Sequence, residues 1–177
     1  MPKEGPGFRA FFIPGKAGTA LLLKPGPKAK GEHREPGNPA RPQEEPIVSE
    51  LENDVGVLEA NSAFYKAFES LDIEAMNAVW DHQEPILCVH PGWPLIQTRE
   101  RVMESWSRIF DNATLIQFAI TGTKPVIEGD AAWVSCTENI TQVLDGRVVE
   151  VKIQATNLFR RQLGNWYLAH HHGSPVG

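Results

Sequence analysis

The chain is poor in several of the features that would indicate a particular environment. Only two of its 177 residues are cysteines, Cys88 and Cys136, and both lie in apolar, strand-like runs. This usage indicates buried free thiols in a reducing compartment rather than a disulfide framework. No apolar run is long enough to span a bilayer, so no membrane partner is expected. The sequence therefore predicts a cytoplasmic protein.

Residues 1–46 differ in composition from the rest of the chain. They contain nine of the 14 prolines and seven of the 15 glycines. Such a segment cannot bury enough apolar surface to offset the entropy lost on ordering. We expect a disordered N-terminal extension over 1–46 and one folded domain over 47–177. The extension is basic in its first part, so organellar import is an alternative to the cytoplasmic location, although serine is absent there.

The folded part has little positive charge. Residues 47–177 carry nine Lys and Arg against 17 Asp and Glu, a net of −8, whereas residues 1–46 have a net of +3. An acidic domain has no general attraction for phosphate backbones, so no nucleic acid partner is expected. The sequence also lacks a glycine-rich phosphate loop, a nucleophile beside a base and a cofactor motif. We accordingly expect no cofactor.

Hydrophobic periodicity predicts helices first and strands after them. A capping box at 49–52 predicts a helix that ends near residue 70, and Asp72 and Thr98 are expected to cap two further helices. Period-2 alternation predicts strands at 86–90, 115–126, 131–143 and on both sides of a turn at 163–165. The order indicates an α+β domain, in which three helices pack on one face of a curved antiparallel sheet.

The order of these elements resembles the nuclear transport factor 2-like superfamily over residues 50–175. The motifs that carry the resemblance are Asp130-Ala131-Ala132, Thr141-Gln142 ahead of Asp145-Gly146, and the closing residues Trp166, His170, His172 and Ser174. The nearest branches are the SnoaL-like and ketosteroid isomerase-like proteins and the association domain of calcium/calmodulin-dependent kinase II. The resemblance implies a cone-shaped, cystatin-like fold and a homodimer formed sheet to sheet. It does not choose among enzymes, binding proteins and oligomerisation modules.

The residues that ketosteroid isomerases use are mostly replaced. Their catalytic aspartate precedes a proline at the end of the first strand, where this chain has His90 before Pro91. Their helix tyrosine matches Phe64, one residue from Tyr65, and their late-strand aspartate falls near Asn157. Tyr65 thus keeps one hydrogen-bond donor close to the position of the family's tyrosine, but His90 and Asn157 replace the two aspartates.

His90 is the candidate catalytic residue. An imidazole titrates near neutrality and can exchange a proton at working pH, and the loop that contains Trp93 could shield it from water. The alternative is a histidine that caps the strand through one hydrogen bond. Asn157 interrupts an otherwise apolar strand face, so either Asn139 on the neighbouring strand or a ligand must satisfy its amide.

Three consecutive histidines close the domain, but they do not predict a metal site. Residues alternate between the two faces of a strand, so His170 and His172 face one way and His171 the other. No spaced set of Cys, His or Asp supplies further ligands. We expect His171 to face the helices and the other two histidines to lie on the outer face of the sheet.

Two functional hypotheses follow. In the first, the domain binds an unknown small organic molecule between the sheet and the first two helices, with or without cofactor-free proton transfer of the isomerase, dehydratase or cyclase type. The expected lining residues are Tyr65, His90, Trp93, Asn139, Asn157 and His171. In the second, the domain is a non-catalytic dimerisation or scaffolding module whose own side chains fill the pocket.

Both hypotheses expect a homodimer formed through the outer face of the sheet. That face is expected to be apolar, with contributions from Val134, Cys136, Ile140, Trp166 and Leu168. Glu138 is expected on the face opposite to Asn139, as an interface residue rather than a catalyst.

Overall fold

The computed structural model describes residues 47–144 and 146–176. Its elements are α1 (Ile47–Ser70), α2 (Ile73–Val79), β1 (Leu87–Val89), β2 (Ile96–Gln97), α3 (Arg99–Asn112), β3 (Ile116–Glu128), β4 (Ala131–Leu144), β5 (Arg147–Gln162) and β6 (Asn165–Pro175). The extension predicted over 1–46 lies outside the described residues, so the domain boundary stays a prediction. None of the described helices is long and apolar enough to cross a membrane.

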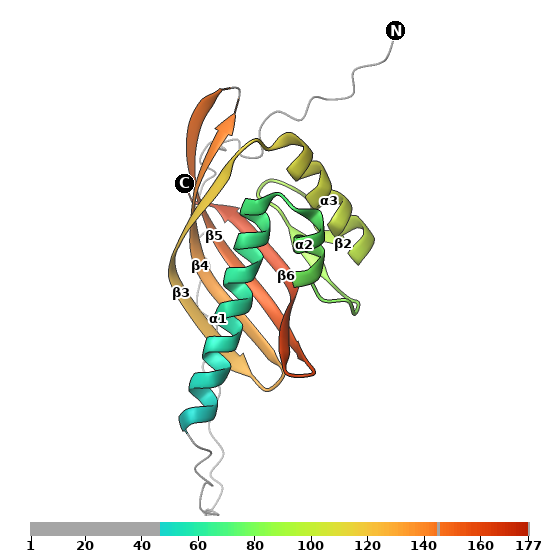
Figure 1. Ribbon diagram of the computed structural model, residues 1–177, viewed down its shortest axis with the longest axis vertical. Helices are drawn as coiled ribbons and strands as arrows, with labels where there is room; N and C mark the ends of the chain where they lie inside the picture. Colours follow the sequence, from blue (N-terminus) through green and yellow to red (C-terminus); the bar gives the residue numbers. More distant parts are fainter. Residues whose placement is uncertain (1–46, 145, 177) are drawn as a thin grey trace, which may run out of the picture.

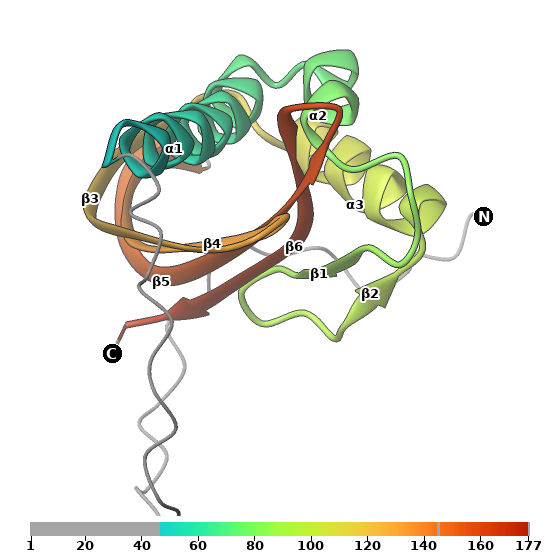
Figure 2. The same ribbon diagram turned by 90° about the horizontal axis from the view of Figure 1, so that it is seen from below.

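The six strands form one mixed, curved sheet in the order β2-β1-β6-β5-β4-β3. All neighbours are antiparallel except β1 and β6, which run parallel. The α+β prediction is therefore confirmed, but a fully antiparallel sheet is wrong. Helix α1 lies across the concave face and contacts β3, β4 and β6, whereas α3 contacts β1 and β2 (Figure 1, Figure 2).

The helix starts follow the predicted residues only in part. Asp72 caps α2, because its side chain accepts hydrogen bonds from the backbone N–H groups of the second and third helical residues. Thr98 precedes α3, but its φ is 71° and its side chain makes no capping hydrogen bond. Helix α1 begins at Ile47, so the predicted cap Ser49 lies inside the helix.

Large aromatic side chains fill the space between the sheet and the helices. Trp80, Trp106 and Phe64 have no exposed surface, and the rings of Phe64 and Trp106 pack edge to face at 5.7 Å. Both cysteines are buried and unpaired, in agreement with the sequence. Each aromatic side chain of this size contributes a large apolar area to the core. The core beneath α2 and α3 is thus closed by protein side chains.

The inner face of β4 was assigned incorrectly from the sequence. Val134, Cys136 and Ile140 are buried toward the helices rather than on the outer face, and Glu138 is buried with them. These four residues occupy every second position of β4, and alternate side chains of a strand lie on the same face of the sheet. Asn139 lies on the opposite face and pairs in register with Lys152, not with Asn157.

A register shift in β6 explains why Trp166, Leu168 and His171 all point inward, although they do not all occupy alternate positions. Phe159 pairs with Leu168, but the preceding residue of β5, Leu158, pairs with His170, so Ala169 is an extra residue on β6. Such a bulge reverses the alternation of faces. Trp166 and Leu168 before it and His171 after it are therefore all buried. The outward placement predicted for Trp166 and Leu168 is wrong, whereas His171 faces the helices as expected.

Candidate functional site

Asn157 on β5 is the centre of a buried hydrogen-bond network. Its Nδ2 donates to Asn61 Oδ1 at 2.8 Å and to the Tyr65 hydroxyl at 3.2 Å. Its Oδ1 lies 2.7 Å from Nδ1 of His171, and because this oxygen can only accept, the imidazole donates. Asn61 and Tyr65 are four residues apart on α1, so they lie on the same helix face. Both the nitrogen and the oxygen of the Asn157 side chain therefore form hydrogen bonds with other side chains of the protein.

Tyr65 connects this network to a buried carboxyl group. Its hydroxyl donates to Glu138 Oε1 at 2.8 Å and lies 3.3 Å from Cys136 Sγ. Burial and the nearby negative charge of Glu138 raise the pKa of Tyr65 far above its usual value. The tyrosine therefore keeps its proton at any physiological pH, and it acts as a hydrogen-bond donor between the carboxyl and its surroundings.

Glu138 is the most perturbed carboxyl among the described residues. Its side chain is 3% exposed, and this burial raises its pKa from 4.5 to about 7, although the hydrogen bond from Tyr65 opposes the shift. A carboxyl with this pKa can both take up and release a proton near neutral pH, as a general acid or base must. The interface role predicted for Glu138 is wrong, because the residue faces the helices.

A crevice of about 480 Å³ opens between α1 and β3, next to the network. Its lining residues are Leu58, Asn61, Ser62, Tyr65, Lys66, Glu69, Phe118, Ile120 and Thr123. Asn61 and Tyr65 belong both to this lining and to the buried network. Tyr65, whose hydroxyl contacts Glu138, is thus part of the crevice wall, and the volume of the crevice lies in the range of small-ligand sites.

Sequence comparison then identifies the family. The profile of the SnoaL-like domain matches residues 57–177. The chain belongs to the SnoaL-like domain family. A similar solved structure is a candidate dehydratase of the nuclear transport factor 2-like family from Streptomyces avermitilis. It shares 38% sequence identity with a TM-score of 0.65, and the match covers 71% of this chain and 97% of that one.

Two further proteins that are similar to the chain have different descriptions. A candidate calcium/calmodulin-dependent protein kinase type II association domain from Thiobacillus denitrificans is 28% identical, with a TM-score of 0.61, covering 67% of this chain and 93% of that one. The F-box protein SKIP8 of Arabidopsis thaliana is 25% identical over 120 residues, which are 68% of this chain. The chain spans about half the length of that plant protein (49%). The predicted superfamily and branch are confirmed.

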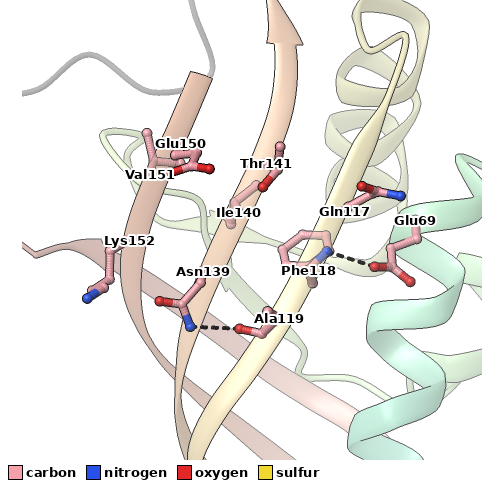
Figure 3. Close-up of a pocket in the computed structure, with 10 residues that line it drawn as sticks. All are labelled: Glu69, Gln117, Phe118, Ala119, Asn139, Ile140, Thr141, Glu150, Val151 and Lys152. Atoms are coloured by element: carbon pink, nitrogen blue, oxygen red, sulfur yellow. Dashed lines mark hydrogen bonds between the residues drawn. The ribbon is translucent and has the colours of Figure 1, made fainter. Parts of the chain in front are cut away.

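A second, larger hollow of about 710 Å³ adjoins the crevice of the SnoaL-like domain. Figure 3 shows its lining from α1, β3, β4 and β5: Glu69, Gln117, Phe118, Ala119, Asn139, Ile140, Thr141, Glu150, Val151 and Lys152. It shares Glu69 and Phe118 with the crevice, and Glu69 Oε1 accepts a hydrogen bond from the backbone N–H of Phe118 at 2.7 Å. The two hollows are therefore neighbours along α1 and β3.

Asn139 lines this second hollow, away from the buried network. Its Nδ2 donates to the backbone oxygen of Ala119 at 2.7 Å (Figure 3). The same nitrogen donates to Thr121 Oγ1 at 3.1 Å, so Asn139 joins β4 to β3. The predicted contact between Asn139 and Asn157 is wrong, because residue 157 pairs with Val134 in the β4–β5 register. The ligand-binding role predicted for Asn139 stays a prediction.

His90 lies in the closed part of the core. It is 1% exposed, and its Nε2 is 2.9 Å from Ser105 Oγ, which itself donates to the backbone oxygen of Val102 at 2.7 Å. Since the serine hydroxyl donates to Val102, Ser105 Oγ accepts the hydrogen bond from the Nε2–H group of His90. Burial lowers the pKa of His90 to about 3, which keeps the ring neutral. Neither hollow is lined by His90, so its catalytic role stays a prediction, and the geometry matches the alternative of a hydrogen-bonded cap.

Trp93 covers His90 rather than the crevice. The two rings pack edge to face at 5.1 Å, and the guanidinium of Arg108 lies 5.8 Å from the centre of the indole ring. Of the six residues predicted to line one pocket, Tyr65, Asn157 and His171 come together in one network. His90 and Trp93 form a cluster beside it, with the rings of His90 and His171 6.4 Å apart.

Two residues of the network, Asn61 and Glu138, were missed as site residues. The signal for Glu138 was its alternation with Cys136 and Ile140, which places it on the buried face. Within the described part of the SnoaL-like domain, no group of three or more His, Cys, Asp and Glu side chains is arranged to hold a metal ion. The side chains of the network take part in hydrogen bonds, and Glu138 can exchange a proton.

Proposed function

We propose that this SnoaL-like domain binds a small organic molecule in the crevice between α1 and β3 and transfers a proton to or from it without a cofactor. The reaction would be an isomerisation, dehydration or cyclisation. One observation carries the proposal: Glu138, 3% exposed and with a pKa of about 7, accepts a hydrogen bond from Tyr65, which lines the crevice. The likeness to a candidate dehydratase supports the same reaction class.

The pair can act as a relay for one proton. When Glu138 is protonated, Tyr65 donates its hydroxyl proton to an oxygen of the bound molecule and accepts the carboxyl proton in its place. Glu138 is left ionised, and the reverse transfer restores both groups. A leaving hydroxyl in a dehydration or a carbonyl in an isomerisation needs such a proton, and positioned groups of this kind accelerate reactions by about 10²- to 10⁴-fold.

Native mass spectrometry of gently purified protein tests this proposal. We expect a retained small molecule whose occupancy falls about tenfold in Tyr65→Phe, since one hydrogen bond contributes about 1 kcal/mol or more. Tyr167→Phe is the matched control, because Tyr167 is the other tyrosine of the chain and does not line the crevice. No retained molecule, together with no thermal shift across a broad metabolite panel, would contradict the proposal.

The alternative function, a dimerisation or scaffolding module, is favoured by the closed core around Trp80 and Trp106.

In either case we propose a homodimer through the outer sheet face. Trp133 and Leu158 are register partners there, and Leu158 is 40% exposed beside His170. In light scattering, Leu158→Glu should convert the dimer to a monomer, whereas Leu163→Glu at the exposed turn should not. A monomeric wild-type protein would refute the proposed interface.

A further inference from the structure

We infer that Asn61 selects the ligand by donating a hydrogen bond to a neutral carbonyl oxygen, so that the crevice takes uncharged ketones, aldehydes or esters with an apolar body. This inference rests on the proposed function of the crevice. It assigns a role to a residue that the sequence did not single out. The argument depends on which atoms of Asn61 the protein already uses.

Asn61 offers a donor and no acceptor to the crevice. Its side chain is 4% exposed and lines the crevice, and its Oδ1 accepts the hydrogen bond from Asn157. Among the residues that the structure describes, no acceptor is bonded to its Nδ2. This Nδ2 is not among the buried side-chain atoms that lack a partner, so it is accessible from the crevice, where a ligand oxygen can accept its hydrogen bond.

The rest of the network fixes the orientation of this amide. His171 donates to Asn157 Oδ1, so the Asn157 amide must present its nitrogen to Asn61 and to Tyr65. Tyr65 in turn donates its proton to Glu138. Each donor in this chain faces an acceptor, and a flipped Asn61 would place two NH₂ groups against each other. The NH₂ group of Asn61 therefore remains available to a ligand.

The surrounding groups decide the class of ligand. Leu58, Phe118 and Ile120 give the crevice an apolar wall that suits a hydrocarbon body. Glu138 lies behind Tyr65 and is partly ionised at neutral pH, and Glu69 lies on the crevice wall. The lining also contains the ammonium of Lys66, but the two carboxyl groups outnumber this one cation and repel a carboxylate ligand, whereas a neutral carbonyl accepts from Asn61 without this repulsion.

A pair of probes that differ only in the carbonyl group tests the inference. We would titrate 1-tetralone and its hydrocarbon analogue tetralin into the full chain at pH 8 and follow ligand NMR signals. The wild type should bind the ketone about tenfold more tightly, the effect of one hydrogen bond to a buried donor. Asn61→Asp keeps the acceptor for Asn157, removes the donor and adds a negative charge, so it should abolish this preference. Asn112→Asp, at an exposed asparagine outside the crevice, is the matched control.

The outcomes separate the inference from the proposed function. If neither probe binds, the crevice does not take small apolar molecules and the proposed function fails. If both bind equally, or if 1-naphthoate binds better than the ketone, the carbonyl assignment alone is overturned. Should Asn61→Asp fail to fold, 1-tetralone labelled with ¹³C at the carbonyl decides with the wild type. Its carbonyl resonance should move downfield on binding, and an unchanged shift refutes the hydrogen bond.

Discussion

Replacing Glu138 with glutamine is expected to stabilise the folded domain at pH 8 by roughly 3 kcal/mol. Glutamine keeps the acceptor for Tyr65 but carries no charge. Burial raises the pKa of Glu138 from 4.5 to about 7, and each unit of such a shift corresponds to about 1.4 kcal/mol. At pH 8 the wild type bears the whole cost of an ionised buried carboxylate, and the variant does not.

The pH dependence of stability has a definite sign. The stability that protonated Glu138 contributes is fully present below pH 4.5 and is lost as the pH rises through about 7. Burial depresses the pKa of His90 to about 3 and also lowers that of His171, so these groups destabilise the fold as the pH falls below 6.5. The wild type should be most stable near pH 6.5, whereas Glu138→Gln should stay equally stable at higher pH.

Urea unfolding at pH 6 and pH 8 measures this difference. The gain from Glu138→Gln should be large at pH 8 and should shrink toward pH 5. Glu150→Gln, at an exposed glutamate on β5, is the matched control and should change stability by less than about 0.5 kcal/mol at either pH. A Glu138→Gln protein that is less stable than the wild type at pH 8 would show that the carboxylate is favourably solvated or paired.

The second large effect concerns Asn157. Its replacement by leucine is expected to destabilise the domain by about 4 kcal/mol, because Asn61 Oδ1 and the Nδ1–H of His171 both lose their partner inside the core. Each buried polar group left without a partner costs about 1–3 kcal/mol. Leucine has a similar size, so cavity formation contributes little. The free energy of unfolding from urea titration gives the result directly.

Asn139 supplies the matched control for this experiment. The sequence offered Asn139 as one of two alternative partners for Asn157, the other being a ligand, yet Asn139 lies on the other face, where water can replace its bonds to Ala119 and Thr121. Asn139→Leu should therefore cost about 1 kcal/mol or less. Similar losses for Asn139→Leu and Asn157→Leu would mean that the buried network is not the special feature of this core.

The fold was predictable because its signals are local. Alternating apolar residues along β5 and the aspartate that caps α2 act through neighbours in the sequence. The strand β2 was missed because two residues carry no periodicity. The parallel pairing of β1 with β6 was also missed, since residues such as Leu87 and His170 are far apart in the chain. Tertiary pairing decides such contacts, and local propensity does not.

The site was less predictable, because it depends on register. Asn139 was expected to face inward beside Asn157, whereas alternation with Val134 and Cys136 places Glu138 there. The bulge at Ala169 lets both Leu168 and His171 point inward, and nothing in the local sequence marks it. A polar residue on an apolar face was informative at Asn157. The same criterion applied to β4 would have found Glu138.

Glu138 breaks the ordinary rules of a core in a way that suits a functional residue. A glutamine or an apolar side chain would fit the buried face at lower cost, so the fold gives up stability at neutral pH to keep a carboxyl there. Functional sites commonly show such a trade of stability for activity. The position of this carboxyl behind Tyr65, which lines the crevice, connects that cost to the proposed proton transfer.

The most direct test of this account is a titration of Glu138 itself. ¹³C NMR of protein labelled at the glutamate carboxyl carbons would follow each resonance with pH, and the one missing from Glu138→Gln is the signal of interest. The account predicts a midpoint near pH 7, the value at which the Tyr65–Glu138 pair can exchange a proton with a ligand. A midpoint near 4.5 would contradict it, since Glu138 would then be ionised at neutral pH and could not supply a proton to Tyr65.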